Sequence, residues 1–481
     1  MASTDARASD GTPTGTGTSS HEALPDPKGI QRRLVGGPLL ATFTVSLATI
    51  TPILGGSTTL RKVDTVDVIR APTIRGHLRF WWRALYGHQC ATPRELAVRE
   101  RALWGGMGGD EGTRSTVDVT VSVEPLGENM VDPSDIEQGA EGAYALWIAR
   151  EQRSGEPKLP AERYRPGVRF RLVVRMPVEH QPEVENAVRA WILWGGYGSR
   201  TRRGLGSLTV TAEEERWLPA SSTGTALRQH LPGVMLFGPT SVAPARDTPS
   251  VCGARLVHGS DSRDAMRAWF KAVEWLRDFR QQQPPDSESI HEGKFARDRG
   301  SPTRPSRSRW PEPDNVRLLL KPPHGKWAHD VRKGKSAKVV WPRSSFGLPV
   351  PIRFQEKNRE RVPYVQLPQP KSEPEEVELR WEDDKKVRER LASPLVVKAM
   401  PLRGGKFVPI ALWLHRAWPR GSVVLVRKKK GALPIPGSKA AFDAPIPPED
   451  AALYAPLVDA NVRDAFLGWL KKHPRGAKEI L

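Results

Sequence analysis

Apolar and polar residues begin to alternate near Ala41, and the chain before that position has no comparable pattern. Residues 1–37 are rich in Ser, Thr, Gly, Pro and Asp and hold few apolar side chains. This composition cannot offset the entropy lost on ordering, so we expect a disordered tail over residues 1–37. After it, Phe43, Val45 and Leu47 recur at every second position, which predicts a half-buried strand.

The spacing of apolar residues between residues 73 and 211 predicts two principal helices and three further strands. Apolar residues recur at helical spacing over residues 73–85 and again over residues 183–194. Alternation predicts strands over residues 117–123 and 168–174, and β-branched residues predict one over residues 207–211. Two helices are inserted among these elements: one over residues 92–104, which opens with a capping box, and a short one near residues 141–151.

Without the insertions, the predicted order is strand, helix, strand, strand, helix, strand. This is the ferredoxin-like βαββαβ arrangement that RNA-recognition (RRM-like) domains use. The sequence has no aromatic RNP motif on its central strands, so base stacking on the sheet is unsupported. We therefore predict an α+β domain over residues 38–215 that contacts RNA through its loops and helices.

The second half has a weaker pattern. An amphipathic helix is predicted over residues 261–282 and a closing helix over residues 462–472. Apolar runs predict strands at residues 395–400, 408–414 and 422–427. Residues 373–390 are charged on all sides, which indicates a solvated segment. These elements predict a second α+β domain over residues 216–481, but its topology does not follow from the pattern.

The stretch Trp194 to Ser207 combines glycines and arginines without an acidic residue, and we call it the Gly/Arg loop. Its candidate phosphate-binding residues are Gly195, Gly196, Gly198, Ser199, Arg200, Arg202 and Arg203, and Gly204 and Gly206 complete its glycines. Glycines let backbone amides approach an anion, and guanidiniums neutralise it. The loop lacks the spacing of a nucleotide P-loop or a dinucleotide fingerprint, which favours a nucleic-acid backbone. The alternative is a tight connection whose glycines satisfy turn geometry.

Charge supports a polyanionic partner. Lys and Arg number 74 against 54 Asp and Glu, giving a formal charge of +20 and a pI near 10.1. Half of that excess lies in residues 294–343, with 14 basic and four acidic residues, inside a basic insertion that we place around residues 283–343. This insertion either meets phosphates or is a disordered basic segment.

Two further sets of residues are candidates for RNA contact. Arg75, Arg79 and Arg83 stand four apart on one predicted helix, and we call them the arginine row. They either bind phosphates or form a solvated helix face. Arg309 and Trp310 either clamp a nucleotide by charge and stacking or pack within the protein.

Cofactor, metal and membrane signals are missing from the sequence. Cys90 and Cys252 form no CxxC pair and no zinc signature, so we predict no cofactor, no metal and no disulfide framework. No apolar run is long enough to span a bilayer and the N-terminus is not signal-like, so we expect a cytoplasmic protein without a membrane partner.

Several stretches resemble one family, the first-numbered subunit of the Cmr complex, which is the type III-B CRISPR effector. They are residues 74–85 (Ile-Arg-Gly-His-Leu-Arg-Phe-Trp-Trp-Arg-Ala-Leu), residues 100–106 ending in Leu-Trp-Gly-Gly, residues 307–314 (Arg-Ser-Arg-Trp-Pro-Glu-Pro-Asp) and residues 391–395 (Leu-Ala-Ser-Pro-Leu). The Gly/Arg loop resembles the glycine-rich loop shared by the whole RAMP superfamily. The resemblance extends from about Ala41 to the C-terminus.

This resemblance implies two ferredoxin-like domains with insertions. It also implies a non-catalytic, RNA-binding capping subunit of a ribonucleoprotein, near the 3′ end of the guide CRISPR RNA, that helps capture target RNA in antiviral defence. The implied partners are the guide RNA, the target RNA and other RAMP subunits. Base pairing between guide and target then recognises the sequence, while the protein binds the RNA through its shape and its sugar-phosphate backbone.

The alternative function is a metal-independent endoribonuclease that processes CRISPR RNA precursors. Some RAMP relatives cut RNA with a histidine, and the available histidines are His77, His88, His258, His324 and His329. His77 lies in the helix of the arginine row. Asp110 and Glu111 lie in an expected loop over residues 105–112, where an isolated acidic pair is usually solvated. No catalytic site assembles from these residues, so we predict that the protein is not an enzyme.

Overall fold

The computed structural model describes residues 39–481 with gaps at 109–110, 138, 153–156, 240–246, 282–309, 323–326, 328–330, 332–337, 355–372, 385, 429–432, 454–456, 458–460, 473–474 and 481. The chain divides into two units, Met1–Leu40 and Ala41–Leu481. The predicted tail lies outside the described residues, and so does most of the predicted basic insertion. The predicted α+β class is confirmed, because helices alternate with several small antiparallel sheets.

The first sheet has the predicted order of elements. Strand β1 (Leu40–Thr49) leads to helix α2 (Ala71–Tyr86), strands β5 (Asp118–Val123) and β8 (Arg169–Pro177), helix α5 (Gln181–Trp194) and strand β9 (Leu208–Val210). The strands lie in the order β5-β8-β1-β9, so the first strand of the set is central and the last lies at an edge. Inward side chains such as Phe43, Val45 and Leu47 are 1–4% exposed, as their alternation predicts.

The second sheet repeats this order of pairing. Strand β10 (Ser250–His258) is followed by helix α8 (Ala265–Gln281), strands β14 (Leu395–Leu402) and β15 (Lys406–His415), helix α10 (Val462–Lys471) and strand β17 (Lys478–Ile480). The strands lie in the order β14-β15-β10-β17. The closing strand β17 pairs antiparallel with β10, Leu256 opposite Ile480. The second half therefore uses the same βαββαβ order as the first half, with long insertions.

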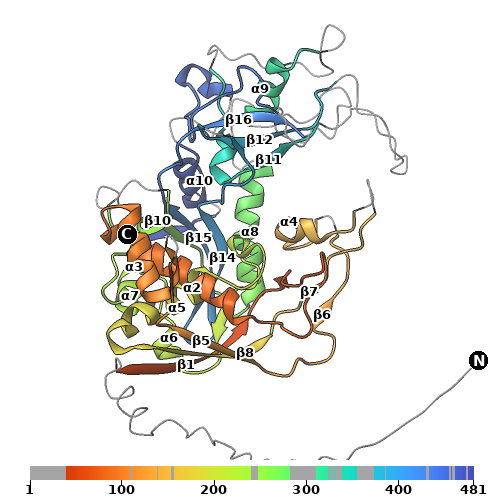
Figure 1. Cartoon of the computed structure of the whole chain (residues 1–481). Coiled ribbons are helices and arrows are strands. Elements are labelled where there is room, and N and C mark those ends of the chain that lie inside the picture. Colours follow the sequence, from red (N-terminus) through yellow and green to blue (C-terminus); the bar gives the residue numbers. More distant parts are fainter. Residues whose placement is uncertain are drawn as a thin grey trace, which may run out of the picture. The chain divides into compact units, whose positions relative to one another are not determined.

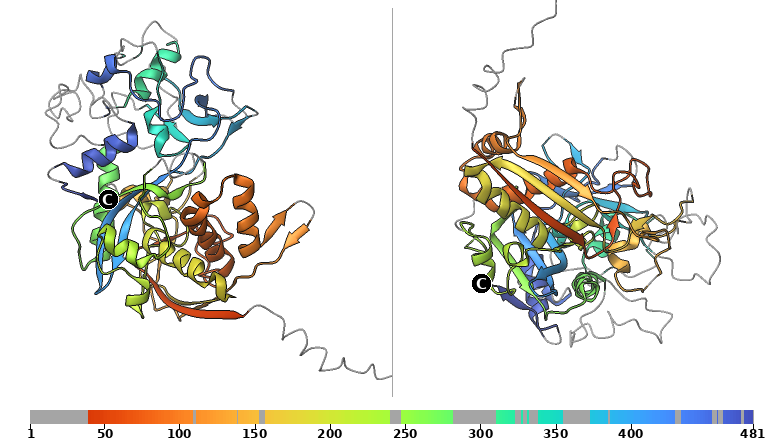
Figure 2. Two further views of the ribbon diagram at one scale, coloured as in Figure 1. Left: turned by 90° about the vertical axis from the view of Figure 1, so that its left-hand side faces the viewer. Right: turned by 90° about the horizontal axis from the view of Figure 1, so that it is seen from below.

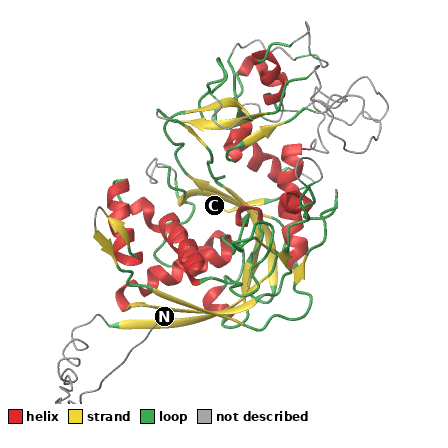
Figure 3. Ribbon diagram, turned by 45° about the vertical axis from the view of Figure 1, so that its right-hand side comes forward, coloured by secondary structure: helices red, strands yellow, loops and turns green. Residues whose placement is uncertain are grey.

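Helices α2 and α5 lie between the two sheets (Figures 1 and 3). Their apolar residues share one core with both the first sheet and one face of the second. On β14, Val396 and Met400 belong to this shared core, whereas Leu395 and Val397 face the core that α8 and α10 cover. Because β14 is buried on both faces, its sequence is a continuous apolar run with one exception, Lys398.

A third sheet is inserted into the second half (Figure 2). Its strands are β11 (Val350–Ile352), β12 (Val377–Glu382), β13 (Val387–Arg388) and β16 (Ser422–Arg427). The prediction of a solvated segment over residues 373–390 is wrong, because Glu373 and Glu378 are 4% and 9% exposed. Arg317 and Arg380 pair with these two carboxylates, and ion pairing is what permits their burial.

The remaining elements are short insertions. They are α3 (Pro93–Trp104), α4 (Ala143–Leu146), α6 (Glu214–Trp217), α7 (Gly224–His230), α9 (Glu312–Leu319), and strands β2 (Ile53–Leu54), β3 (Gly106–Gly108), β4 (Glu111–Thr113), β6 (Val131–Asp132) and β7 (Arg163–Tyr164). Thr92 caps α3 as predicted, since its side chain accepts a hydrogen bond from Glu95 N at 3.1 Å. The expected loop over residues 105–112 is instead a β3–β4 hairpin. Among the described residues, no helix has the length and apolar character needed to cross a membrane.

Candidate nucleic-acid interface

The Gly/Arg loop leaves the C-terminal end of α5 and packs inside the protein. Gly195 N donates to Trp191 O at 2.9 Å, Ser199 N to Leu54 O at 2.7 Å and Gly206 N to Pro52 O at 2.8 Å. Tyr197 N donates to Gly206 O at 2.9 Å, which closes the loop on itself. These amides are therefore used by the protein fold and do not form an open cradle for an anion.

The glycines of the loop allow close packing of backbone on backbone and on rings. A Cβ at Gly206 would lie 1.8 Å from Tyr197 O, and one at Gly204 would lie 2.5 Å from Trp269 Cδ1. Both glycines have positive φ, at 62° and 76°, a region that disfavours other residues. Of the two alternatives, turn and packing geometry therefore explains the glycines, and the arginines are left to supply any contact with an anion.

Three arginines of the loop have different surroundings. Arg200 is exposed, whereas Arg202 and Arg203 are partly buried. Arg202 stacks over the Phe80 ring at 5.4 Å and donates to Ser393 O, and burial followed by the nearby Arg416 lowers its pKa to about 10. Arg203 reaches Leu395 O at a long 3.4 Å. Arg202 thus joins the loop to residues 391–395, one of the stretches that carry the family resemblance.

A buried lysine also joins the loop to the second sheet. Lys398 of β14 is fully buried and its Nζ donates to Ile192 O at 3.0 Å and to Gly195 O at 2.8 Å. These carbonyls end α5, where a cation interacts favourably with the helix dipole. Burial lowers the pKa of Lys398 to about 7. The sequence gives one signal for this contact, a lysine within an otherwise apolar strand.

The arginine row lies on the side of α2 that faces α3. Arg79 Nε donates to Glu100 Oε1 at 2.8 Å, and Arg83 Nη1 donates to the same oxygen at 2.5 Å. Arg75 donates to Trp104 O. Each of the three remains partly exposed, and Arg75 and Arg79 line a hollow of about 710 Å³ beside β5 and β8. The row therefore holds α3 against α2, and its contact with RNA remains a prediction.

The structure places Trp310 in the interior. Its ring is 2% exposed, packs on Phe279 and Phe346, and donates through Nε1 to Arg280 O at 2.9 Å. A base cannot stack on a ring that is buried in the protein, so packing is the alternative that describes Trp310. Arg309, its proposed companion, lies outside the described residues.

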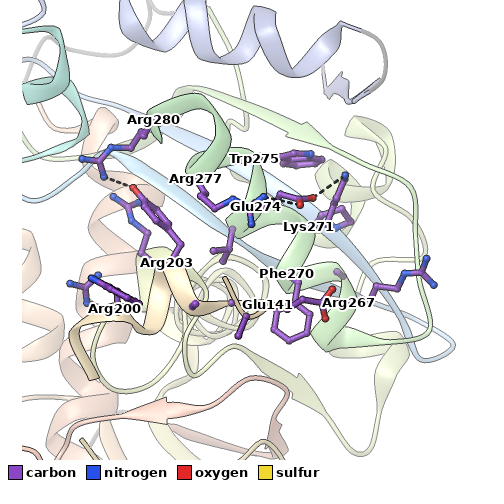
Figure 4. A pocket seen from close by; sticks show the side chains of 18 of the residues that line it. Glu141, Arg200, Arg203, Arg267, Phe270, Lys271, Glu274, Trp275, Arg277 and Arg280 are labelled. Carbon is purple, nitrogen blue, oxygen red and sulfur yellow. Dashed lines mark hydrogen bonds and ion pairs between the residues drawn. The ribbon is translucent and has the colours of Figure 1, made fainter. Parts of the chain in front are cut away.

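A large basic cleft lies beside the exposed side of the Gly/Arg loop (Figure 4). Its volume is about 1870 Å³, and its walls come from residues 139–152, the Gly/Arg loop, α8 and the loop after β10. The basic residues that line it are Arg150, Arg200, Arg203, Arg267, Lys271, Arg277, Arg280 and Arg475, against the acidic residues Glu141, Asp261 and Glu274. Phe270 and Trp147 add aromatic surface, whereas Trp275 in the wall is only 2% exposed. Cations interleaved with aromatic rings suit single-stranded nucleic acid.

The sequence predicts only part of this cleft. The composition of the Gly/Arg loop indicates Arg200 and Arg203, whereas the apolar stripe of residues 261–282 predicts a helix and no site. Arg267 and Lys271 stand four apart on α8, the same spacing that drew attention to the arginine row. That spacing was the available signal. The contribution of residues 139–152 had no signal, because those residues reach the cleft only through tertiary packing.

The candidate catalytic and metal-binding residues do not converge on the cleft. His77 stacks against Trp191 with ring centroids 6.1 Å apart, and burial lowers its pKa to about 4. His88 is partly exposed and burial lowers its pKa, while His258 Nδ1 lies 3.1 Å from Ser222 Oγ. Asp110, His324 and His329 lie outside the described residues, and so does the side chain of Glu111. Within the described part of the chain, no group of three or more His, Cys, Asp or Glu could hold a metal.

Comparison with known proteins agrees with the resemblance predicted from the sequence. Residues 46–209 match the family model of the RAMP superfamily. Over 158 residues the chain is 29% identical to the CRISPR system Cmr subunit Cmr1-1 of Pyrococcus furiosus, which is 32% of this chain and 44% of that relative. The matched region therefore spans less than half the length of this curated relative. The predicted resemblance to the RAMP superfamily and the Cmr subunit is confirmed.

Two solved structures match most of the chain at low identity. A crystal structure of Cmr1 from Pyrococcus furiosus in its apo form matches 86% of this chain and 96% of its own, with 14% identity and a TM-score of 0.43. A chain in a cryo-EM structure of the type III-B Cmr-beta bound to cognate target RNA matches 79% of this chain and 95% of its own, with 11% identity and a TM-score of 0.38.

Proposed function

We infer that this protein is an RNA-binding subunit of a type III-B CRISPR effector. Two findings support this inference: residues 46–209 match the RAMP superfamily, and the sequence resembles a Cmr1 subunit. Its proposed partners are guide CRISPR RNA, target RNA and other RAMP subunits. We place it as a non-catalytic capping subunit near the 3′ end of the guide, where it helps capture target RNA inside the cell. The basic cleft is the observation that carries the RNA-binding proposal.

The repeated strand order supports two ferredoxin-like domains. Each of the two four-stranded sheets follows βαββαβ order, with its first strand inside the sheet and its fourth at an edge. We propose domains over residues 38–215 and 216–481, the second interrupted by the third sheet and by the basic segment. Because α2 and α5 share a core with β10 and β14, the two proposed domains are packed together along buried surface.

The cleft suits the backbone of RNA rather than its base sequence. Long basic side chains line its walls, and Arg200, Arg267 and Lys271 are exposed. Cations of this kind bind phosphates and release counterions regardless of sequence. Sequence reading is then left to pairing between guide and target. His77, the candidate for the endoribonuclease alternative, stacks on Trp191, is partly exposed and does not line the cleft, and burial lowers its pKa to about 4.

Removal of three exposed charges from the cleft tests this function. The triple variant Arg200→Gln, Arg267→Gln, Lys271→Gln is expected to bind single-stranded RNA more weakly at every sequence. The slope of log K against log salt falls in magnitude by roughly 2, at about 0.7 for each lost phosphate contact. Fluorescence anisotropy with two unrelated RNA sequences at several salt concentrations measures both quantities.

A matched control removes the same charge elsewhere. Arg94, Lys439 and Lys478 are exposed and do not line the cleft, so replacing all three with glutamine lowers net charge equally. This control is expected to keep a slope close to that of the unmodified protein. If both triple variants lose the same RNA affinity and the same salt slope, RNA binding depends on the net charge of the protein and not on the cleft.

A further inference from the structure

Arginine side chains gather at one side of the basic cleft without acidic partners. Figure 4 shows Arg200, Arg203 and Arg280 on one side and Arg267 and Lys271 on the other. Arg343, from the 3₁₀ helix Pro342–Phe346, does not line the cleft but interacts electrostatically with Arg280. We call Arg200, Arg203, Arg280 and Arg343 the guanidinium cluster. It combines residues from the Gly/Arg loop, α8 and the start of the third-sheet insertion.

The members of the cluster lie close enough to repel one another. Burial, followed by Arg280, lowers the pKa of Arg203 to about 10. Burial, again followed by Arg280, lowers the pKa of Arg343. Arg200 is exposed at the surface, and partial desolvation by the surrounding chain is the largest cause that lowers its pKa, with Tyr144 opposing the shift and Arg280 adding to it. Arg280 is thus the common neighbour of the other three guanidiniums.

The fold supplies little negative charge to this group. Within the described part of the chain, none of the four guanidiniums forms an ion pair, and Arg280 Nε and Arg343 Nε are buried without a hydrogen-bond partner. Glu312 interacts with Arg343: its Oε1 accepts from Arg343 N at 2.6 Å, and burial raises the pKa of Glu312 to about 7. A carboxyl that is partly protonated at neutral pH cannot neutralise four cations.

Two other cations of the cleft are compensated. Lys271 and Arg277 both pair with Glu274, at 3.2 Å and 2.9 Å, and Arg277 also pairs with Asp278. The guanidinium cluster is therefore a group of neighbouring cations without ion pairs among the described residues, whereas Arg267 on the opposite side is exposed to solvent. Partly buried like charges are unfavourable unless a counter-charge binds between them, so an anion at this position stabilises the arrangement.

The chemistry of the cluster favours a phosphate that carries more than one charge. An internal phosphodiester has a single charge, and cations spread along a groove suffice to hold it. A phosphate monoester has a charge of about −1.5 to −2 at neutral pH and three free oxygens, which arginine forks bind in pairs. The hydroxyl of Tyr144, which accepts from Arg280 Nη1 at 2.8 Å, adds a donor at the cleft wall.

We propose that the guanidinium cluster binds a terminal phosphate monoester of an RNA strand, with Arg200, Arg203 and Arg280 in contact with it at the cleft wall. The identity of the strand rests on the proposed function, whereas the phosphate site rests on the cluster alone. The cluster then fixes one end of an RNA chain, and the remaining basic residues of the cleft hold the nucleotides next to it.

Three RNA oligonucleotides of one sequence test the proposal. One carries a 3′-phosphate, one a 5′-phosphate, and one has hydroxyl groups at both ends. One of the phosphorylated strands is expected to bind at least about tenfold more tightly than the hydroxyl strand, since charge-assisted hydrogen bonds of this kind are strong. The strand that does so identifies which end the cluster holds. Equal affinities of all three strands for a protein that binds RNA would overturn the phosphate site and leave the proposed function standing.

Two variants separate the cluster from the rest of the cleft. Arg200→Gln, at an exposed position, is expected to remove most of the preference for the phosphorylated end. Arg267→Gln, on the opposite side of the cleft, is expected to weaken binding of all three strands alike and keep the preference. If Arg267→Gln removes the preference for the phosphorylated end and Arg200→Gln keeps it, the phosphate does not bind at the guanidinium cluster.

Inorganic phosphate tests the site without RNA. It is expected to raise the Tm of the unmodified protein above that in chloride of equal ionic strength, and to raise the Tm of Arg200→Gln less. The absence of a difference from chloride overturns the site even if RNA still binds. Failure of the protein to bind any RNA, with a phosphate-specific rise in Tm, would instead sink the proposed function and keep the phosphate site.

Discussion

Replacement of Gly206 by alanine is expected to prevent stable folding, with a loss in free energy of unfolding of about 4 kcal/mol or more. The new Cβ would lie 1.8 Å from Tyr197 O and 2.8 Å from Tyr197 C, and both are backbone atoms that cannot move aside as a side chain could. Gly206 also has φ of 62°, which adds strain for any side chain. Urea unfolding followed by tryptophan fluorescence measures the loss.

A second glycine provides the control for backbone conformation alone. Gly404 has φ of 72°, close to that of Gly206, but a Cβ there meets nothing within 4 Å. Gly404→Ala is expected to cost only about 1 kcal/mol, the penalty for a side chain in the left-handed region. Equal losses for the two variants would show that tight closure of the Gly/Arg loop on Tyr197 contributes nothing to stability.

Replacement of Lys398 by methionine is expected to destabilise the protein by an amount that grows with pH. The variant leaves Ile192 O and Gly195 O without their buried donor, which costs about 1–3 kcal/mol for each unsatisfied group. At low pH this loss is offset, because the unmodified protein then buries a charged ammonium. At high pH the amine is neutral and nothing offsets the loss.

The direction of this pH dependence follows from the number of protons that the folded and the unfolded chain bind. The pKa of Lys398 is about 7 in the folded protein and near its ordinary 10.5 in the unfolded chain. Between these values the unfolded chain binds more protons, so stability rises with pH through this window and falls again as pH returns to 7. The difference in free energy of unfolding between the protein and Lys398→Met, measured at pH 6.5 and 9.5, tests this. A difference that is the same at both pH values contradicts it.

An exposed lysine separates this effect from general titration. Lys478 lies at the start of β17 with an exposed side chain, and Lys478→Met is expected to leave the pH profile of stability unchanged. If Lys398→Met changes stability without altering RNA affinity at low salt, the link between β14 and α5 serves folding only. Loss of RNA affinity at a pH where the variant is folded would show that the link also positions the Gly/Arg loop.

The first half of the fold could be predicted because its elements keep one apolar face. Phe43, Val45 and Leu47 alternate cleanly on β1, and Thr92 is a helix cap that local sequence specifies. The topology of the second sheet could not be predicted. Strand β14 is buried on both faces and so lacks alternation, and more than a hundred residues separate it from its predecessor α8.

The candidate site was predicted in part, because its composition is local and its packing is not. The Gly/Arg loop was recognised from its own residues, but Trp269 and Ser393, which fill the space against it, lie far away in sequence. For the same reason Glu100, which neutralises part of the arginine row, was not paired with Arg79 and Arg83. Residues chosen for charge alone therefore include some whose partners are within the protein.

Crosslinking of RNA to the purified protein tests most directly whether the basic cleft holds RNA. Single-stranded RNA containing 4-thiouridine is irradiated with the protein, and crosslinked peptides are identified by mass spectrometry. Crosslinks are expected in peptides that cover residues 139–152, residues 200–203 and residues 265–280, which form the walls of the cleft. Efficient crosslinks confined to other surfaces, such as the exposed arginines of β8, would contradict the account.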